Sequence, residues 1–189
     1  MLRPLGKTLR LPAVLVLTLV FIHGLDSAAS ARDLSSAELS SLKETVTRFD
    51  AAMHGNNYEV VVDTIPPRVL GHIAEQSGLE RDKLRTFVIA TMKQTLAAVK
   101  LVSFGMDTGK LDQKQLVDGT PFALIPTHTV MDAGNGKISV NSHTLALIDD
   151  GTWYLLRVSE AQQIEILRKV YPEFAGVAFP TGSVEAMKD

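Results

Sequence analysis

The chain has 189 residues, of which 46% are hydrophobic and 21% are charged, and its formal net charge is −2. These values are typical of an ordinary globular domain. Because the sequence also lacks a basic run, they argue against a nucleic-acid partner, which would require clustered Lys and Arg to bind phosphates. The sequence contains no cysteine, which excludes a disulfide framework, a thiolate nucleophile, a cysteine zinc site and lipid attachment through cysteine.

The first 31 residues have the pattern of a signal peptide. Three basic residues lie within the first ten, an almost unbroken apolar run follows from Leu11 to Ile22, and Ala29-Ser30-Ala31 forms a small-x-small cleavage site. The apolar run has about a dozen residues, fewer than the roughly 20 that a membrane-spanning helix requires. We therefore expect a periplasmic or secreted protein that is cleaved after Ala31. The alternative is an uncleaved segment that anchors the chain in a membrane.

Three helices are expected in the first half of the remaining chain. The first begins at a capping box, Ser35-Ser36-Ala37-Glu38, and ends at Gly55. A short apolar segment, 58–65, separates it from helices at about 68–77 and 80–98. The last of these carries an apolar stripe that we expect in the core, made of Leu84, Phe87, Val88, Met92, Leu96 and Val99.

From Lys100 onward the apolar residues follow the two-residue period of strands. We expect strands at 100–106 and 111–117, and then a three-stranded meander between Thr120 and Val158. Its tight turns are 133–136 and Asp150-Gly151, which are rich in the glycine that such turns need. A second capping box, Ser159-Glu160-Ala161-Gln162, begins a short helix that Pro172 ends.

The segment after this helix is apolar, with Phe174, Val177 and Phe179. Such a patch is expected to pack against the body of its own molecule or against a neighbouring one, for example in a homodimer. The alternative is a frayed terminus. Residues 181–189 are polar and are expected to form a disordered tail.

The order of helices, antiparallel meander and last helix is typical of an α+β fold. Together with Asp149-Asp150-Gly151-Thr152-Trp153-Tyr154-Leu155-Leu156 at the final hairpin, it resembles the nuclear transport factor two-like superfamily, also called SnoaL-like. The resemblance covers about 34–158. It implies one domain, 32–180, with three N-terminal helices packed in the concave face of a curved antiparallel sheet and a short C-terminal helix. It also implies a cone-shaped cavity, although members of this superfamily have many different functions.

The tight turns predict the register of the meander. Pairing Asp132 with Lys137 places His128 opposite Asn141, with His143 as a diagonal neighbour. Pairing Asp149 with Thr152 places Leu147 opposite Tyr154. One face then carries His128, Asn141, His143 and Tyr154 with Leu124, Leu145, Leu147, Leu156 and Val158. The other carries Thr127, Thr129, Thr144, Trp153 and Arg157.

The first face is the more apolar, so we assign it to the interior of the cone. His128, Asn141, His143 and Tyr154 are therefore the candidate ligand-binding residues. Two histidines without a visible third ligand make a poor metal site, and the sequence predicts no cofactor. The alternative is that both histidines lie near a sheet end and bond only to solvent or backbone.

Several functions remain open. The first is an exported, noncatalytic module that binds a small apolar ligand or a protein partner in the cavity, and it is favoured because no general acid–base pair can be named. The second is a cofactor-free lyase or isomerase acting on a hydrophobic substrate, which would need an ionisable group inside the apolar cone. The third is an interaction subunit that dimerises through its apolar tail.

Overall fold

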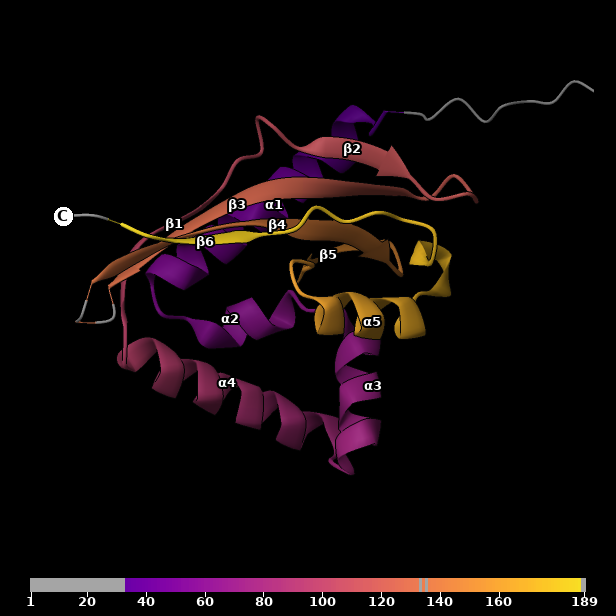
Figure 1. Cartoon of the computed structure of the whole chain (residues 1–189). Helices are drawn as coiled ribbons and strands as arrows, with labels where there is room; N and C mark the ends of the chain where they lie inside the picture. The colour runs from indigo at the N-terminus through magenta and orange to yellow at the C-terminus, as the bar shows by residue number, and fades with distance from the viewer. Residues whose placement is uncertain (1–32, 133, 135, 188–189) are drawn as a thin grey trace, which may run out of the picture. The chain divides into compact units, whose positions relative to one another are not determined.

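The computed structural model describes residues 33–132, 134 and 136–187, so the predicted signal peptide lies outside the described residues. Four helices come first: α1 (Ser36–His54), α2 (Tyr58–Asp63), α3 (Pro67–Ser77) and α4 (Arg81–Ala97). Five strands follow: β1 (Lys100–Met106), β2 (Asp112–Gln115), β3 (Pro121–Asp132), β4 (Lys137–Asp149) and β5 (Thr152–Arg157). The last described elements are α5 (Ala161–Val170), the 3₁₀ turn η1 (Pro172–Phe174) and β6 (Ser183–Ala186) (Figure 1).

The predicted α+β fold is confirmed, but four helices rather than three precede the first described strand. The additional helix is α2, which comes from the segment that the sequence marks only as apolar. Its valines are poor helix formers. However, Asn57 caps its first turn by accepting a hydrogen bond from the N–H of Val60 (3.3 Å). Tyr58, Val61 and Val62 are also buried, so packing outweighs the low helix propensity.

The six strands form one antiparallel sheet built around the long β3–β4 hairpin. β1 and β2 both pair with β3, at different ends of it, and β5 and β6 share β4 in the same way. The sheet curls strongly into a half-barrel (Figure 1). Within the described part of the chain, no helix is both long and apolar enough to cross a membrane.

The predicted register is confirmed at both turns of the meander. His128 lies opposite Asn141, and Leu147 lies opposite Tyr154. The β4–β5 turn is Asp150-Gly151, and both residues have a positive φ, 47° and 72° respectively. Two-residue hairpins favour this conformation because it matches the twist of the strands. Local turn chemistry therefore decides which side chains share a face.

Helices cover both faces of the sheet. Residues opposite one another in an antiparallel pair share a face, so the pairing defines two sets. The α1 face carries Ala123, Ile125, Thr127, Thr129, Val140, Ser142, Thr144, Ala146, Leu155 and Arg157. The α5 face carries Phe122, Leu124, Pro126, His128, Asn141, His143, Leu145, Leu147 and Tyr154.

Each face has its own core cluster. On the α1 face, Leu42 and Val46 of α1 pack against a cluster that includes Ile125, and Figure 1 shows α1 passing behind the strands. On the α5 face, Leu167 of α5 packs against a cluster that includes Phe122. The two halves of the hydrophobic core are thus separated by the sheet.

The segment after α5 packs on its own molecule, as one of the sequence alternatives predicts. Phe174 is 2% exposed, and its ring meets the ring of Phe122 edge-on at 5.2 Å between centroids. Val177 and Phe179 are partly buried against the same cluster. The predicted disordered tail is wrong for Ser183–Ala186, which form β6. This strand pairs with the part of β4 that β5 does not reach, and so supplies hydrogen-bond partners to that backbone.

One of the two predicted capping boxes is present. The Ser35 hydroxyl accepts a hydrogen bond from the N–H of Glu38 (3.2 Å), and the Glu38 carboxylate accepts one from the N–H of Ser35 (2.8 Å). The second predicted capping box, Ser159-Glu160-Ala161-Gln162, is absent. The Ser159 hydroxyl accepts instead from the N–H of His143 (3.4 Å), so it fastens the start of α5 to β4 rather than capping the helix.

A polar network joins α3, α5 and the end of β4. The Tyr171 hydroxyl donates a hydrogen bond to the Asp149 carboxylate (2.7 Å), and the Arg68 guanidinium lies 4.3 Å from the centre of the Tyr171 ring. Arg68 also donates to the carbonyl of Val170 (2.7 Å). Burial, assisted by the hydrogen bond to Asp149, raises the pKa of the Tyr171 hydroxyl well above its ordinary value of 10.0.

The substitution Tyr171→Phe tests this network. We expect a loss of about 1–2 kcal/mol in the free energy of unfolding near neutral pH, because a hydrogen bond to a charged acceptor is removed. The contribution of a raised pKa is fully present below the unfolded-state pKa and is lost as the pH rises above it. Denaturant unfolding at increasing pH should therefore show the difference between wild type and variant shrinking above about pH 10. A difference that stays constant there would contradict the raised pKa.

Candidate functional site

A cavity lies between the α1 face of the sheet and the N-terminal helices. It consists of two adjoining hollows of about 330 Å³ and 290 Å³, which share the side chains of Met92, Phe104, Thr129 and Arg157. The first hollow lies toward α4 and β1, and the second toward α1, α2 and β5. Together they are in the size range of pockets that hold small organic ligands.

The walls of the cavity are apolar. The apolar residues that line it include Phe49 and Met53 of α1, Met92 and Leu96 of α4, and Phe104 of β1. The rings of Phe49 and Phe104 are 5.7 Å apart and tilted by 45°, so they close one side of the cavity together. Methionine side chains are flexible and can adjust to ligands of different shape.

The expectation that the stripe on α4 belongs to the core is wrong for part of it. Leu84 and Ile89 are buried, but Phe87 is 63% exposed. Met92 and Leu96 are only partly buried, because they border the cavity instead of closing onto the sheet. Periodicity identifies a face of a helix, but it does not show whether that face meets packed side chains or a hollow.

The floor of the cavity carries hydroxyl groups. Thr127, Thr129, Ser142 and Thr144 project from neighbouring positions of β3 and β4. The Thr127 hydroxyl donates to the carbonyl of Ile125 (3.1 Å) and lies 2.8 Å from the Thr144 hydroxyl. Because the single proton of Thr127 is used on the carbonyl, Thr144 is the donor between the two hydroxyls. The floor therefore satisfies much of its own hydrogen bonding.

Arg157 is the only ionisable residue among the described residues that line this cavity. It is the last residue of β5 and lies opposite Thr144, and its side chain is 50% exposed. Its guanidinium is 3.8 Å from the Glu160 carboxylate, which is 62% exposed. A guanidinium stays protonated throughout the physiological range, so this residue supplies a permanent positive charge where the cavity meets solvent.

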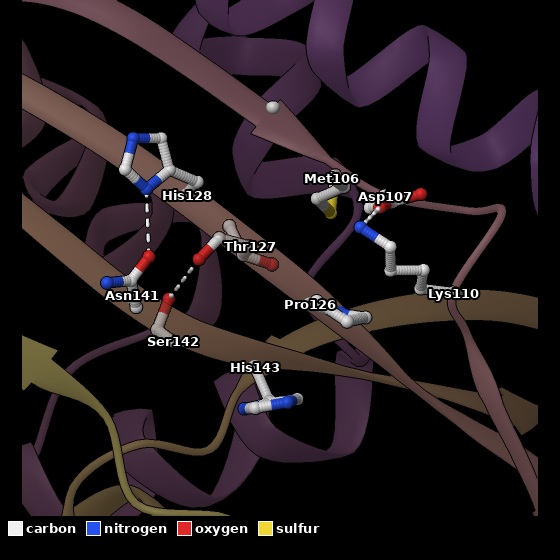
Figure 2. Close-up of a pocket in the computed structure, with 10 residues that line it drawn as sticks. Met106, Asp107, Lys110, Pro126, Thr127, His128, Asn141, Ser142 and His143 are labelled. Atoms are coloured by element: carbon white, nitrogen blue, oxygen red, sulfur yellow. Dashed lines mark hydrogen bonds and ion pairs between the residues drawn. The ribbon is translucent and has the colours of Figure 1, made fainter.

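The structure places three of the four predicted site residues together, but on the α5 face. His128, Asn141 and His143 line a depression of about 460 Å³ (Figure 2). His128 Nδ1 and Asn141 Oδ1 are 2.9 Å apart, and both side chains are exposed. His143 lies farther along β4, and its Nδ1 is buried with no partner among the described residues. Tyr154 is not in this depression and packs against the cluster around Phe122.

The assignment of this face to the interior of the cone is therefore wrong. The face is apolar because α5, η1 and the segment after them cover the half that contains Phe122 and Leu147. Val69 of α3 also packs into the cluster around Phe122, whereas α1 packs on the opposite face. The hydropathy of the strands indicates that both faces of the sheet are covered. It does not identify which helices cover each face.

The depression on the α5 face does not form a metal site from its own residues. Within the described residues, no group of three or more His, Cys, Asp or Glu side chains is placed to hold a metal ion. Asp107, at the rim, lies 3.1 Å from the Lys110 ammonium, and Figure 2 shows the two side chains joined. This hydrogen bond holds the pKa of the Asp107 carboxyl below its ordinary value, so the carboxylate stays ionised.

In comparisons with known proteins, no family model, no curated protein and no solved structure matches the chain. The functional assignment therefore depends on the geometry of the two sites. The sequence placed Thr127, Thr129, Thr144 and Arg157 together on one face, as the structure does, but assigned the interior of the cone to the other face. It assigned Met92 and Leu96 to the core. A usable signal was the recurrence of hydroxyl residues at every second position, Thr127 and Thr129 on one strand and Ser142 and Thr144 on the next. Short hydroxyl side chains at paired positions leave space between the strands and the helices that cover them.

Two valine substitutions test the direction of the hydroxyl chain. Thr127→Val removes the acceptor of Thr144 and leaves that buried donor unpaired, so we expect a loss of about 1–2 kcal/mol in the free energy of unfolding. Thr144→Val leaves the bond from Thr127 to Ile125 intact, and we expect a loss below about 1 kcal/mol. Chemical denaturation of both variants measures the two losses. A larger loss for Thr144→Val would mean that the chain of donors runs the other way.

Proposed function

We propose that this protein is an exported, noncatalytic module that binds a small apolar ligand in the cavity on the α1 face. The observation that supports this function is the composition of the lining, apolar walls over a floor of hydroxyls. An apolar ligand gains roughly 25 cal/mol for each Å² of apolar surface that it removes from water, so such walls supply most of the binding energy. The resemblance to the nuclear transport factor two-like superfamily supports a cavity in this position.

Catalysis by a cofactor-free lyase or isomerase is the less favoured function. It needs a group that can accept and return a proton at the substrate. The one ionisable residue among the described residues of the lining is Arg157, and a guanidinium does not lose its proton in a protein. The histidines, which could transfer protons, lie on the α5 face.

Filling the cavity tests the proposed function. Thr129 lines both hollows, so Thr129→Phe places an aromatic ring where they adjoin. The probe is N-phenyl-1-naphthylamine, a neutral apolar dye whose fluorescence rises on leaving water. We expect saturable binding to the wild type and at least a tenfold loss of affinity in the variant. The free energy of unfolding, measured in parallel, separates a blocked cavity from an unfolded protein.

The neighbouring residue provides a matched control. His128→Phe adds the same ring to the same strand, but on the α5 face, and should leave dye binding unchanged. Replacing both His128 and His143 by alanine should also leave it unchanged. If the histidine variants lose binding while Thr129→Phe retains it, the ligand site is the depression on the α5 face.

We also propose that the chain reaches the periplasm or the cell exterior through removal of its first 31 residues. The support is the basic start, the short apolar run and the Ala29-Ser30-Ala31 ending. The intact mass of the protein isolated from its host should correspond to a chain that begins at Arg32. A mass that includes residues 1–31 would contradict cleavage.

A further inference from the structure

The first hollow is charged where it adjoins the second and apolar at its far end. Arg157 borders both hollows and is half-exposed, so it stands where their shared part opens to solvent. The first hollow extends from there between α4 and the strands, toward Leu96, Leu101 and Met131. A ligand that fits this arrangement has a polar group at Arg157 and an apolar body along α4.

The charge at this end is positive and weakly compensated. The Glu160 carboxylate lies 3.8 Å away, beyond ordinary hydrogen-bond distance, and both side chains are half-exposed or more. Exposed ion pairs of this kind contribute about 0–1 kcal/mol, so a ligand can replace Glu160 at little cost. No carboxylate is present among the described residues that line the cavity, so nothing inside it repels an anion.

Two features at this end suit a carboxylate. A guanidinium presents a planar pair of N–H donors that matches the two oxygens of a carboxylate. Gln163 of α5 lines the second hollow, and its amide oxygen accepts from the N–H of Ser159 (3.2 Å). Its amide NH₂ group is thereby left as a second donor among the lining residues of this hollow.

We propose that the ligand is an amphipathic monocarboxylate, whose carboxylate pairs with Arg157 and whose apolar chain lies along Met92, Leu96 and Phe104. The inference rests on the proposed function and adds to it the chemical class of the ligand. It follows from one permanent cation at the open end of a cavity whose first hollow is otherwise lined by apolar side chains and threonines.

The test compares decanoate with 1-decanol, which have the same chain and differ in charge. Both are titrated below their aggregation limits into wild-type protein, Arg157→Gln and Arg48→Gln. Arg48 is an exposed residue of α1 outside the lining, so its substitution changes the net charge equally without touching the cavity. We expect the wild type and Arg48→Gln to bind decanoate at least tenfold more tightly than decanol. Arg157→Gln should lose that preference and keep its affinity for decanol.

Methionine methyl resonances show where the ligands bind. Met53, Met92 and Met131 line the first hollow. With ¹³C-methyl-labelled methionine, both ligands should shift these three resonances. Single Met→Leu variants assign the signals, and added salt should weaken the binding of decanoate more than that of decanol.

The outcomes separate the two proposals. If both ligands shift the cavity methionines with equal affinity, or if Arg157→Gln keeps the preference for decanoate, the carboxylate inference is wrong and the apolar-ligand function stands. If neither ligand shifts these resonances and the neutral dye also fails to bind, the proposed function itself is wrong. If the cavity methionines do not shift but replacing His128 and His143 by alanine abolishes the binding of decanoate, the ligand site lies on the α5 face and both proposals fail.

Discussion

The alternation of side chains along the β3–β4 hairpin is the constraint on which the rest of the structure depends. A slip of one residue in its register would move every side chain of the slipped strand to the other face, so that on β3, for example, His128 would replace Thr127 in the cavity. The glycine-containing turns prevent this slip because their positive φ angles fit one connection between the strands. The chemistry of the cavity is thus set by residues that do not line it.

The two faces differ in the volume of their side chains, and this difference explains where the cavity lies. On the α5 face, Phe122, Tyr171 and Phe174 fill the space under α5 and η1, and each is at most 2% exposed. On the α1 face, the middle of β3 and β4 carries threonines and a serine, which are too short to reach α4. α1 packs closely around Ile125, at one part of this face. The hollow remains where the short hydroxyl side chains lie.

Sequence patterns predicted the features that neighbouring residues determine. They failed to predict which distant elements cover each face of the sheet. The strands, both turns and the pairing of His128 with Asn141 followed from residues close in sequence. The helix at Tyr58–Asp63 was missed because its valines favour strands, and contacts with distant residues add to the Asn57 cap in making it helical. The face assignment failed for the same reason, since the apolar character of Leu145 and Leu147 is equally consistent with cover by the N-terminal helices or by α5. Three of the four predicted site residues still lie together, because register alone brings them together.

The hydrogen bonding of the cavity floor determines how selective the site can be. Since Thr144 donates to Thr127 and Thr127 to Ile125, these two buried hydroxyls have partners without any ligand, and an apolar molecule can cover them without leaving their donors unpaired. A floor of unpaired hydroxyls would instead have demanded a polar ligand of matching shape. Discrimination is therefore left to the fixed charge of Arg157 at the open end and to the fit of the walls. Such an arrangement suits tolerant binding of related amphipathic molecules better than the exact placement of a reacting atom.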